Sequence, residues 1–463
     1  MNKKLELFKQ RINGKKIAVL GIGISNKPLI KFLVKNGAIV TAFDRKLPEE
    51  LGDTYNELKE LKISFSLGED YLKNLDHEII FKTPGMRFDI PELLEAKKRG
   101  SVVTSEMEVF FDLCPAEIIG ITGSDGKTTT TTLVYLMLQQ GGYTCWLGGN
   151  IGKPLLDEIE NIESTHKVIV ELSSFQLQTM RTSPNIAIIT NITPNHLDVH
   201  KSMEEYIEAK KNIFLHQDPF GKLVVNYDNE ITKKFGQEAI GNFMYFSRKS
   251  EIDNGVFLQD NDIFIKVDGK KQKVISISDI MIPGMHNVEN YMAAISAVWG
   301  IVNVDAIKAV ANSFKGVEHR IEFVREVNGV KFYNSSIDSS PNRTIATLNT
   351  FNQKVILIAG GKDKNIPYDE LGDVLVQKVK SLILIGQTAD KIEKALKDKM
   401  KQLAIKNEIP VYRCSTYKEV VQTAYSNAQA GDIVVLSPAS TSFDMFKNFE
   451  ERGRVFKELV NEL

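Results

Sequence analysis

One stretch constrains the fold more than any other: residues 116–142, AEIIGITGSDGKTTTTTLVYLMLQQGG. An apolar run that suits a buried strand leads into a glycine-containing loop, and the loop leads into an amphipathic helix that ends at two glycines. This is the context of a phosphate-binding P-loop. The general pattern needs a glycine five positions before Gly126, but Ile121 stands there, with glycines at 120 and 123. Spacing alone therefore leaves two readings open, a nucleotide site of its own type and a flexible turn.

The residue types in this loop favour the nucleotide site. Glycines let the backbone turn its N–H groups toward a phosphate, and the helix start adds a favourable dipole. Lys127 can bring a positive charge to the β- and γ-phosphates, and the hydroxyl of Thr128 can bind Mg²⁺. The predicted ATP-binding loop comprises Gly123, Ser124, Asp125, Gly126, Lys127, Thr128 and Thr129.

Strands and helices alternate along the whole chain, which predicts an α/β protein. We expect three domains: a Rossmann-like domain over residues 1–111, a central P-loop ATPase-type parallel sheet over 112–315, and a second Rossmann-like domain over 316–463. Residues 255–281 alternate apolar and polar side chains between Asn, Asp and Gly turns, so small antiparallel strands are expected there.

Composition excludes several classes of function. The formal net charge is −1, from 58 basic and 59 acidic residues, so no strong field would hold nucleic acid or an anionic membrane. The three cysteines lie far apart and suggest neither a disulfide framework nor a metal site. The N-terminus lacks the apolar region of a signal peptide, and no run approaches the length of a membrane span. A cytoplasmic protein is expected.

Polar residues follow the apolar strands of the central segment, where ligands of open parallel sheets bind. Glu171 ends a strand expected beside the P-loop strand, within reach of a nucleotide-bound Mg²⁺. His196, Asp198 and His200 resemble a metal cluster, although histidines in loops are often hydrogen-bonding surface groups. Lys210 lies on a predicted helix, and chemistry alone does not distinguish it from a solvated lysine.

Two further patterns have a functional and a plain interpretation. Asn287 and Asn290 share a helix face and suit recognition of a purine edge, but helix capping is an alternative. GIGISN, residues 21–26, has two glycines of the dinucleotide fingerprint and Asn26 in place of the third. Its turn could bind a pyrophosphate, with Asp44 at the next strand end accepting hydrogen bonds from a ribose or a base. A tight turn without a ligand is the other interpretation.

The C-terminal segment offers charged and hydroxyl groups. Arg320, Arg343 and Lys364 are candidates for contacts to phosphate or carboxylate. Residues 437–442 follow a strand and form a hydroxyl-rich turn that suits a carboxylate.

Taken together, the motifs resemble those of the Mur ligase family over essentially the whole chain. The motifs are TGSDGKTTT, GGNIG, ELSSFQL, NITPNHLD, EAKKNIF, PGMHNVEN, EHR and LSPASTSFDMFKNFEERG, in family order. The loop pattern of the family is TGxxGK[ST][ST], which accounts for the spacing of the glycines before Lys127. ELSSFQL and the last motif indicate its D-glutamate-adding branch.

The resemblance implies an ATP-dependent amide ligase of peptidoglycan precursor synthesis that activates a carboxylate as an acyl phosphate, and thus a role in building the cell wall. The implied substrates are ATP, UDP-N-acetylmuramoyl-L-alanine and D-glutamate, with Mg²⁺ as cofactor, expected as two ions; a monomer is expected, with no nucleic acid and no membrane as partner. The implied metal ligands are Thr128, Glu171, His196 and a carbamylated Lys210; Lys127, His196 and Lys210 are the implied catalytic residues.

The resemblance also assigns the remaining contacts. Adenine and ATP contacts fall on Asn287, Asn290 and Arg320. The UDP-linked substrate falls on Ile24, Ser25, Asp44, Arg45, Asn150 and the turn from Thr83 to Gly85. D-Glutamate falls on Lys364, Ser442, Phe443 and Phe449.

The chain departs from the family where NDSKATN is common, because NSSIDSS puts Ser335 in place of Asp and Ile337 in place of Lys. Asp338 and Arg343 are nearby charged candidates to take over these contacts. Asp125, where Asn is common, is a minor variation. Three rivals remain: a related ligase for another amino acid, an NAD-dependent oxidoreductase suggested by GIGISN, and a P-loop module that binds ATP without ligating anything. The oxidoreductase leaves the P-loop and residues 190–215 unexplained.

Overall fold

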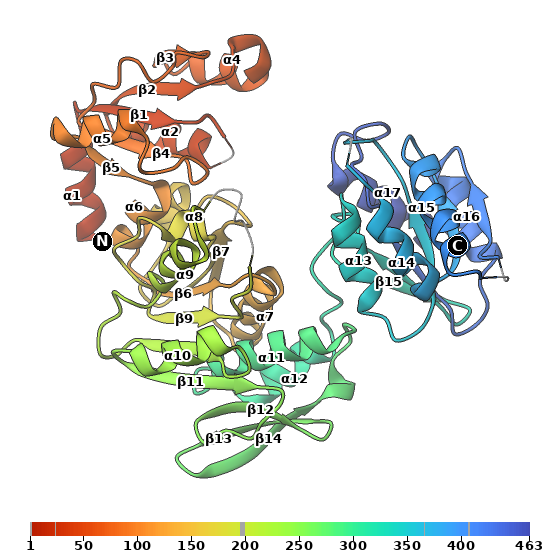
Figure 1. The fold of residues 1–463 in the computed structure, drawn as a ribbon. Coiled ribbons are helices and arrows are strands. Elements are labelled where there is room, and N and C mark those ends of the chain that lie inside the picture. The colour runs from red at the N-terminus through yellow and green to blue at the C-terminus, as the bar shows by residue number, and fades with distance from the viewer. Residues whose placement is uncertain (1, 24, 195–199, 365, 406–407) are drawn as a thin grey trace. The chain divides into compact units, whose positions relative to one another are not determined.

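A computed structural model describes residues 2–23, 25–194, 200–364, 366–405 and 408–463 (Figure 1). Two compact units are present: Met1–Ile277 with Glu289–Val310, and Ser278–Val288 with Ala311–Leu463. Three sheets rich in parallel strands lie along the chain, which confirms the predicted α/β class. No helix in these described ranges has both the length and the apolar character that a bilayer span requires.

The first sheet is parallel throughout, with the order β3-β2-β1-β4-β5. Its strands are β1 (Lys16–Leu20), β2 (Ile39–Asp44), β3 (Ser64–Leu67), β4 (Ile79–Lys82) and β5 (Val102–Thr104). Its helices are α1 (Lys3–Ile12), α2 (Asn26–Lys35), α3 (Pro48–Leu51), α4 (Asp53–Lys59) and α5 (Pro91–Lys98). The carboxyl ends of β1, β2 and β4 meet at one edge, beside the turns that were predicted to hold a ligand.

The second sheet has the order β14-β13-β12-β11-β10-β9-β6-β8-β7. Its strands are β6 (Glu117–Thr122), β7 (Cys145–Gly149), β8 (Lys167–Glu171), β9 (Ile186–Ile189), β10 (Lys222–Asn226), β11 (Asn242–Ser247), β12 (Gly255–Gln259), β13 (Asp262–Val267) and β14 (Lys270–Ser276). The P-loop strand β6 lies between β8 and β9, so all three carboxyl ends converge. Strands β12 to β14 are antiparallel, as the alternation of residues 255–281 predicted.

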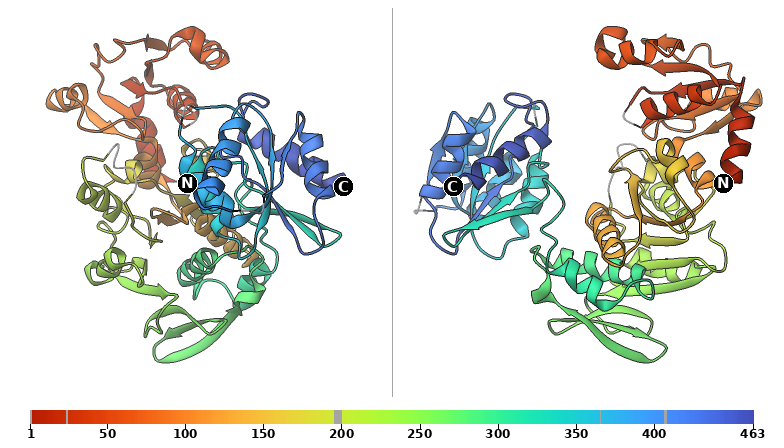
Figure 2. Two further views of the ribbon diagram at one scale, coloured as in Figure 1. Left: turned by 45° about the vertical axis from the view of Figure 1, so that its right-hand side comes forward. Right: turned by 180° about the vertical axis from the view of Figure 1, so that it is seen from behind.

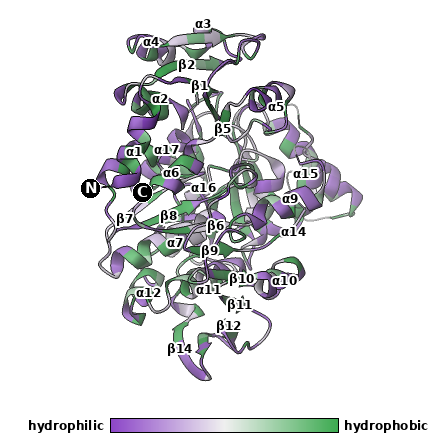
Figure 3. Ribbon diagram, turned by 90° about the vertical axis from the view of Figure 1, so that its left-hand side faces the viewer, coloured by the Kyte–Doolittle hydropathy of each residue, from purple (hydrophilic) through white to green (hydrophobic). Residues whose placement is uncertain are grey.

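The helices of the middle segment are α6 (Glu106–Leu113), α7 (Lys127–Gln140), α8 (Ser174–Leu177), α9 (Met203–Lys211), α10 (Glu230–Glu238), α11 (Met285–Val298) and α12 (Val304–Ala311), with 3₁₀ turns at Leu156–Asn161 and Ile277–Asp279. Hydrophobic residues fill β6, β8 and β9, whereas the helices alternate polar and apolar faces (Figure 3). Continuous apolar runs suit parallel strands that are covered on both faces.

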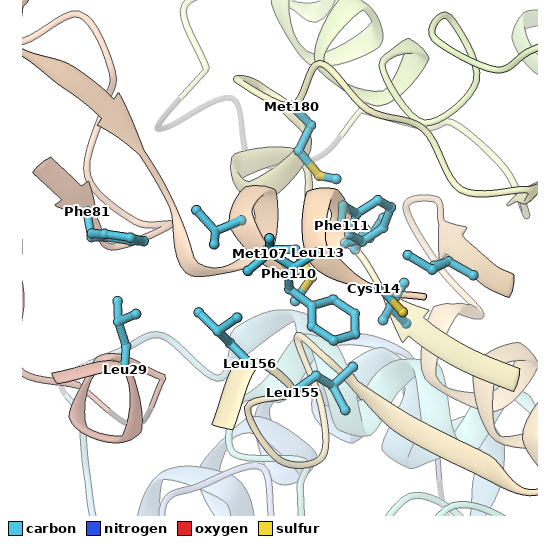
Figure 4. Close-up of a cluster of buried hydrophobic side chains, with 14 of the residues drawn as sticks. Leu29, Phe81, Met107, Phe110, Phe111, Leu113, Cys114, Leu155, Leu156 and Met180 are labelled. Atoms are coloured by element: carbon cyan, nitrogen blue, oxygen red, sulfur yellow. The ribbon is translucent and has the colours of Figure 1, made fainter. Parts of the chain in front are cut away.

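Helix α6 lies in a hydrophobic core shared by the first two sheets. Phe110 packs near Leu155 and Leu156, and Leu29 and Phe81 from the first sheet's layers belong to the same buried cluster (Figure 4). Helix α1 packs against α6 (Figure 2). Asn2 Nδ2 donates to the carbonyl oxygen of Leu113 at 2.7 Å. Helix α6 runs across residue 111, which is the predicted end of the first domain. The division of the chain into three domains stays a prediction.

The third sheet has the order β15-β16-β20-β17-β18-β19, and only the β15–β16 pair is antiparallel among these described strands. Its strands are β15 (Glu322–Val327), β16 (Val330–Asn334), β17 (Val355–Ala359), β18 (Val379–Leu384), β19 (Val411–Arg413) and β20 (Ile433–Leu436). Its helices are α13 (Pro341–Asn349), α14 (Asp369–Lys378), α15 (Ala389–Gln402), α16 (Tyr417–Ser426) and α17 (Phe449–Asn461).

Candidate functional site

The loop between β6 and α7 has the backbone of an anion-binding turn. Gly126 lies just before α7 with a φ of +79°, and Gly123 has a φ of +148°, values that L side chains rarely adopt. A Cβ atom on Gly126 would lie 2.2 Å from Oδ1 of Asn290, so a side chain has no room there. Asn290 also accepts a hydrogen bond from Thr130 Oγ1 at 3.3 Å, which places this predicted adenine contact against the loop.

Two lysines meet at the same loop. Lys127 Nζ donates to the carbonyl oxygens of Gly123 at 3.1 Å and Ser124 at 2.9 Å. Lys210 Nζ donates to Gly123 O at 2.8 Å and to Thr122 Oγ1 at 3.1 Å. Both lysine side chains therefore meet at the carbonyl oxygen of Gly123.

Lys210 is buried, with 2% of its surface exposed, whereas the side chain of Lys211 is 16% exposed and pairs with Glu238 at 2.6 Å. Burial first, and the charge of Lys127 second, hold the pKa of Lys210 well below its ordinary value. The structure thus separates two adjacent lysines that the sequence pattern alone did not distinguish.

Glu171 collects polar contacts at the end of β8. Its Oε2 accepts a hydrogen bond from Thr128 Oγ1 at 2.7 Å, and its Oε1 accepts one from Asn150 Nδ2 at 2.8 Å. Glu171 is buried, with only 2% of its surface exposed. A carboxylate and a hydroxyl at this separation are oxygen donors of the kind that Mg²⁺ prefers.

The loop is braced from the β9 side. Ser124 Oγ lies 3.0 Å from the hydroxyl of Tyr206, and it donates to Thr193 O at 3.0 Å. The backbone N–H of Asp125 donates to Asn191 Oδ1 at 3.0 Å. Thr129 is buried in the first turn of α7. These contacts fix the loop before any ligand arrives.

Of the three residues that resemble a metal cluster in the sequence, His196 and Asp198 lie outside the described residues. His200 is a buried core histidine: its Nε2 lies 2.8 Å from Ser174 Oγ, and its ring stacks on Phe175 at 5.1 Å. Across the described ranges, no group of three or more His, Cys, Asp or Glu side chains is arranged to hold a metal ion by itself.

The first sheet places most of its predicted ligand residues at one edge, and Ile24 lies outside the described residues. Oδ2 of Asp44 accepts the backbone N–H of Ile22 at 2.6 Å, which brings the β2 end onto the glycine turn. Asn26, at the position where the fingerprint has glycine, donates to Leu20 O at 3.0 Å and Gly21 O at 2.8 Å. Its side chain therefore stabilises the turn. The half-buried Ser25 precedes α2, and Arg45 is exposed.

The turn after β4 lies beside the same glycines. A Cβ atom on Gly21 would lie 3.1 Å from Thr83 Cγ2, so the two turns touch. Gly85 is exposed two residues later. A cavity of about 310 Å³ is lined in part by Tyr71, whose pKa is raised by burial and then by the charge of Asp44. Tyr71 is a group that the sequence pattern did not single out.

In the second unit, loops after β17 and β20 run side by side. Lys362 N donates to Thr441 O at 2.8 Å, which joins the loop of the exposed Lys364 to that of the buried Ser442. Phe443 is 60% exposed next to it.

Three other predicted residues of this unit make backbone or ring contacts. The half-buried Phe449 lies edge-on to His319, with ring centroids 6.0 Å apart. Arg320 N donates to Val317 O at 2.9 Å. Asn287 donates from Nδ2 to Pro283 O at 2.6 Å, a contact typical of a helix start.

Comparison with known proteins identifies the family of this chain. The description "Mur ligase middle domain" matches residues 121–298, and "Mur ligase, glutamate ligase domain" matches residues 319–440. The chain belongs to the Mur ligase family. The UDP-N-acetylmuramoylalanine--D-glutamate ligases of Ruminiclostridium cellulolyticum and Acetivibrio thermocellus are each 59% identical to it, over 100% of both chains.

Solved structures show the same fold at lower identity. The UDP-N-acetylmuramate-alanine ligase of Thermotoga maritima matches with a TM-score of 0.58 and 20% identity, covering 97% of this chain and 99% of its own. A pseudomurein peptide ligase type C from Methanothermus fervidus matches with a TM-score of 0.52 and 19% identity, covering 97% and 100%.

The departure from the Mur ligase pattern near residue 335 has a structural consequence. Asp338 is buried, and its Oδ2 accepts hydrogen bonds from Thr347 Oγ1 and Ser437 Oγ, both at 2.7 Å. It therefore fixes the turn after β20 rather than facing a ligand. Arg343 instead is exposed and donates from Nη1 to Ile337 O at 3.2 Å, beside the substituted position.

Arg452 is a residue that sequence reasoning missed, although it lies in the quoted FEERG motif. Only 1% of it is exposed. Its Nη2 donates to Ser336 O at 2.7 Å and its Nη1 to Ser440 O at 3.0 Å. It joins the loops after β16 and β20, which carry the departure and the predicted D-glutamate contacts.

Proposed function

We propose that this chain joins D-glutamate to UDP-N-acetylmuramoyl-L-alanine, with hydrolysis of ATP to ADP and phosphate, in peptidoglycan precursor synthesis. The observation that carries the proposal is the 59% identity, over the full length of both chains, to ligases named for this reaction. The half-buried Lys127 and the buried Lys210 and Glu171 gather around the turn between β6 and α7, and this arrangement supports the proposal.

The chemistry needs an activated carboxylate, because a free carboxylate is a poor electrophile. Its oxygen attacks the γ-phosphorus of ATP, ADP leaves, and an acyl phosphate forms. The amine of D-glutamate then attacks the acyl carbon, a tetrahedral intermediate forms, and phosphate leaves with the oxygen. The amine loses a proton, and the product is an amide.

The P-loop residues would bind ATP in this scheme. Backbone N–H groups of residues 126–128, at the start of α7, would contact the phosphates, with Lys127 offsetting their charge. Asn290, which lies against Gly126, would contact the adenine side, and Asn287 and Arg320 are assigned there by family resemblance. Ser124, Asp125 and Thr129 complete the loop.

Thr128 and Glu171 would hold Mg²⁺, since their oxygens lie 2.7 Å apart at the end of β8. A bound Mg²⁺ would offset the charge of the crowded phosphates. His196 and Lys210 would serve a second ion, with Lys210 as a carbamate. The lowered pKa of Lys210 favours the neutral amine, the form that adds carbon dioxide.

The substrates would bind to residues at the strand ends described above. Ser25, Ile24, Asp44, Arg45, Thr83, Gly85 and Asn150 would contact the UDP-linked substrate, and Lys364, Ser442, Phe443 and Phe449 would contact D-glutamate. We place the reaction in the cytoplasm, where ATP and UDP-linked precursors are found. One chain supplies every proposed group, so a monomer suffices.

Phosphate release tests the proposal. The wild-type protein should release phosphate from ATP only when both UDP-N-acetylmuramoyl-L-alanine and D-glutamate are present. L-Glutamate and L-lysine serve as matched amino acids. Equal release with L-lysine or L-glutamate would contradict the substrate assignment, and release without any amino acid would favour a nucleotide-binding module over a ligase.

A further inference from the structure

A charged turn follows the predicted UDP-substrate residues of β4. Arg87, two residues after Gly85, donates from Nε to Asp89 Oδ1 at 2.8 Å and from Nη2 to Asp89 Oδ2 at 2.9 Å. The same Nη2 donates to Oε1 of Glu205 at 2.9 Å. The guanidinium therefore fixes its own turn and reaches a residue 118 positions away in the sequence.

Glu205 lies in the first turn of α9, where several donors hold its carboxylate. Its Oε2 accepts the backbone N–H of Lys201 at 2.5 Å, and its Oε1 accepts Gln178 Nε2 at 3.0 Å. Lys201 returns to the turn by donating from Nζ to Asp89 Oδ2 at 2.7 Å. Two separate charge-assisted contacts thus join the turn to the start of α9.

Helix α9 connects these contacts to the ATP loop. Tyr206, the next residue after Glu205, has its hydroxyl 3.0 Å from Ser124 Oγ. Lys210, at the other end of the helix, donates to Gly123 O at 2.8 Å. Glu205, Tyr206 and Lys210 thus lie on one nine-residue helix, which contacts the turn after β4 at its start and the ATP loop along its length.

The ion pairs are sheltered more than ordinary surface pairs. Arg87, Asp89 and Glu205 side chains are 23%, 24% and 22% exposed. Hydrogen bonding to Arg87 is the main cause that lowers the pKa of both Asp89 and Glu205, so both are ionised at neutral pH. Lys9 with Glu160 is a comparable bridge, at 2.6 Å and 23% and 39% exposure, but it leads from α1 to the 3₁₀ turn.

We propose that Arg87 is a positioning residue that couples binding of the UDP-linked substrate at the turn after β4 to the ATP loop through Glu205 and α9. A ligand that orders this turn favours one position of Arg87, and Arg87 in turn favours one position of α9. This inference rests on the proposed function, because it takes the turn after β4 as part of the UDP-substrate site. Coupling between two sites is reciprocal, so either ligand reports it.

The affinity for a non-hydrolysable ATP analogue, measured by calorimetry with and without UDP-N-acetylmuramoyl-L-alanine, tests the proposal. In the wild type the UDP-linked substrate should tighten analogue binding about fivefold or more, the lower end of common coupling factors. In Arg87→Ala the ratio of the two affinities should fall below that of the wild type, with the contact of Lys201 to Asp89 left in place, and Arg87→Lys should restore part of it. Lys9→Ala, which removes the comparison bridge, should keep the wild-type ratio.

A second variant guards against misfolding. If Arg87→Ala does not fold, Glu205→Gln decides, because it removes the charge of the partner and keeps its shape; its ratio should also fall. A ratio of one in the wild type, or a wild-type ratio in the decisive variant, would overturn the coupling. Failure of D-glutamate-dependent phosphate release in the wild type would instead overturn the proposed function, so the two failures are distinct.

Discussion

Thr128 Oγ1 donates a 2.7 Å hydrogen bond to Oε2 of Glu171, joining the first turn of α7 to the end of β8. The two residues are 43 positions apart in the sequence, and they meet because β6 and β8 are parallel neighbours. The contact brings a hydroxyl and a carboxylate to the place where a nucleotide-bound cation would be held.

Glu171→Gln should remove the charge of this site while preserving its shape. We expect phosphate release to fall by about 100-fold or more, since a group that stabilises developing charge is usually worth that much. The Mg²⁺ concentration for half-maximal rate should rise. Thr132→Ala is a matched control on α7, because Thr132 Oγ1 donates to the carbonyl oxygen of Thr128 at 2.8 Å, a contact within the helix. Wild-type Mg²⁺ dependence in Glu171→Gln would contradict the assignment.

Lys210→Arg should abolish most activity, whereas Lys211→Arg should retain it. Arginine keeps a positive charge but does not form the proposed carbamate, and its larger head does not fit beside Thr122 and Gly123. Because the pKa of Lys210 is lowered, the neutral amine becomes populated at lower pH than for a solvated lysine. Wild-type activity should therefore depend on bicarbonate. Added bicarbonate should restore activity more fully as the pH rises. Rates measured with and without added bicarbonate check this.

The fold class was predictable because apolar runs and glycine turns alternate along the chain. The edge strand β7 was not singled out, since it is short, ends in two glycines and is held by pairing with its one neighbour, β8. The β15–β16 hairpin adds an antiparallel edge for the same reason. Local patterns specify a buried parallel strand well, and they specify a strand at an edge poorly.

The site was predictable where a motif carries the chemistry, as for Lys127 and Thr128. Burial was not predictable: Lys210 and Lys211 are adjacent in the sequence, and only the fold buries the first. Arg452 was missed because an arginine in a helix is normally solvated. Its partners Ser440 and Ser336 lie in loops 12 and 116 positions away in the sequence. Tertiary contacts decide such roles.

Gly126→Ala should impair ATP binding by steric conflict. The new Cβ would lie 2.2 Å from Oδ1 of Asn290, and φ is +79°. Gly142→Ala is the control, since Gly142 has a φ of +89° just beyond the other end of α7 and a Cβ there meets nothing within 4 Å. Both variants should lose about 1 kcal/mol of stability from backbone strain. Only Gly126→Ala should weaken binding of the ATP analogue; equal affinities in the two variants would contradict this account.

Glu106→Gln should change how stability depends on pH. Glu106 is buried at the start of α6, where Oε1 accepts the N–H of Leu156 at 3.1 Å, and burial raises its pKa from 4.5 to about 7. The folded protein therefore binds more protons than the unfolded chain between these values, so this group destabilises the fold as the pH rises through that window. Glutamine does not titrate. Relative to the wild type, the variant should gain on the order of 2 kcal/mol between pH 5 and pH 8.

Urea unfolding at the two pH values, followed by a probe of the first unit, measures that gain. Glu160→Gln is a control at the surface, because ion pairs with Lys9 and Lys35 lower its pKa rather than raise it. An unchanged difference between wild type and Glu106→Gln at pH 5 and pH 8 would show that Glu106 keeps one protonation state throughout.

Arg343→Ala should raise the KM for D-glutamate by about tenfold, the usual loss for one charged hydrogen bond. Arg343 donates to the carbonyl oxygen of Ile337 at 3.2 Å, and its guanidinium is exposed. Arg325→Ala is a matched control in the same unit, because Arg325 also donates to a single backbone carbonyl, that of Asn461 at 3.0 Å. The KM for ATP should stay constant in both variants. A wild-type KM for D-glutamate in Arg343→Ala would remove this arginine from the substrate site and leave Lys364 as the expected source of positive charge.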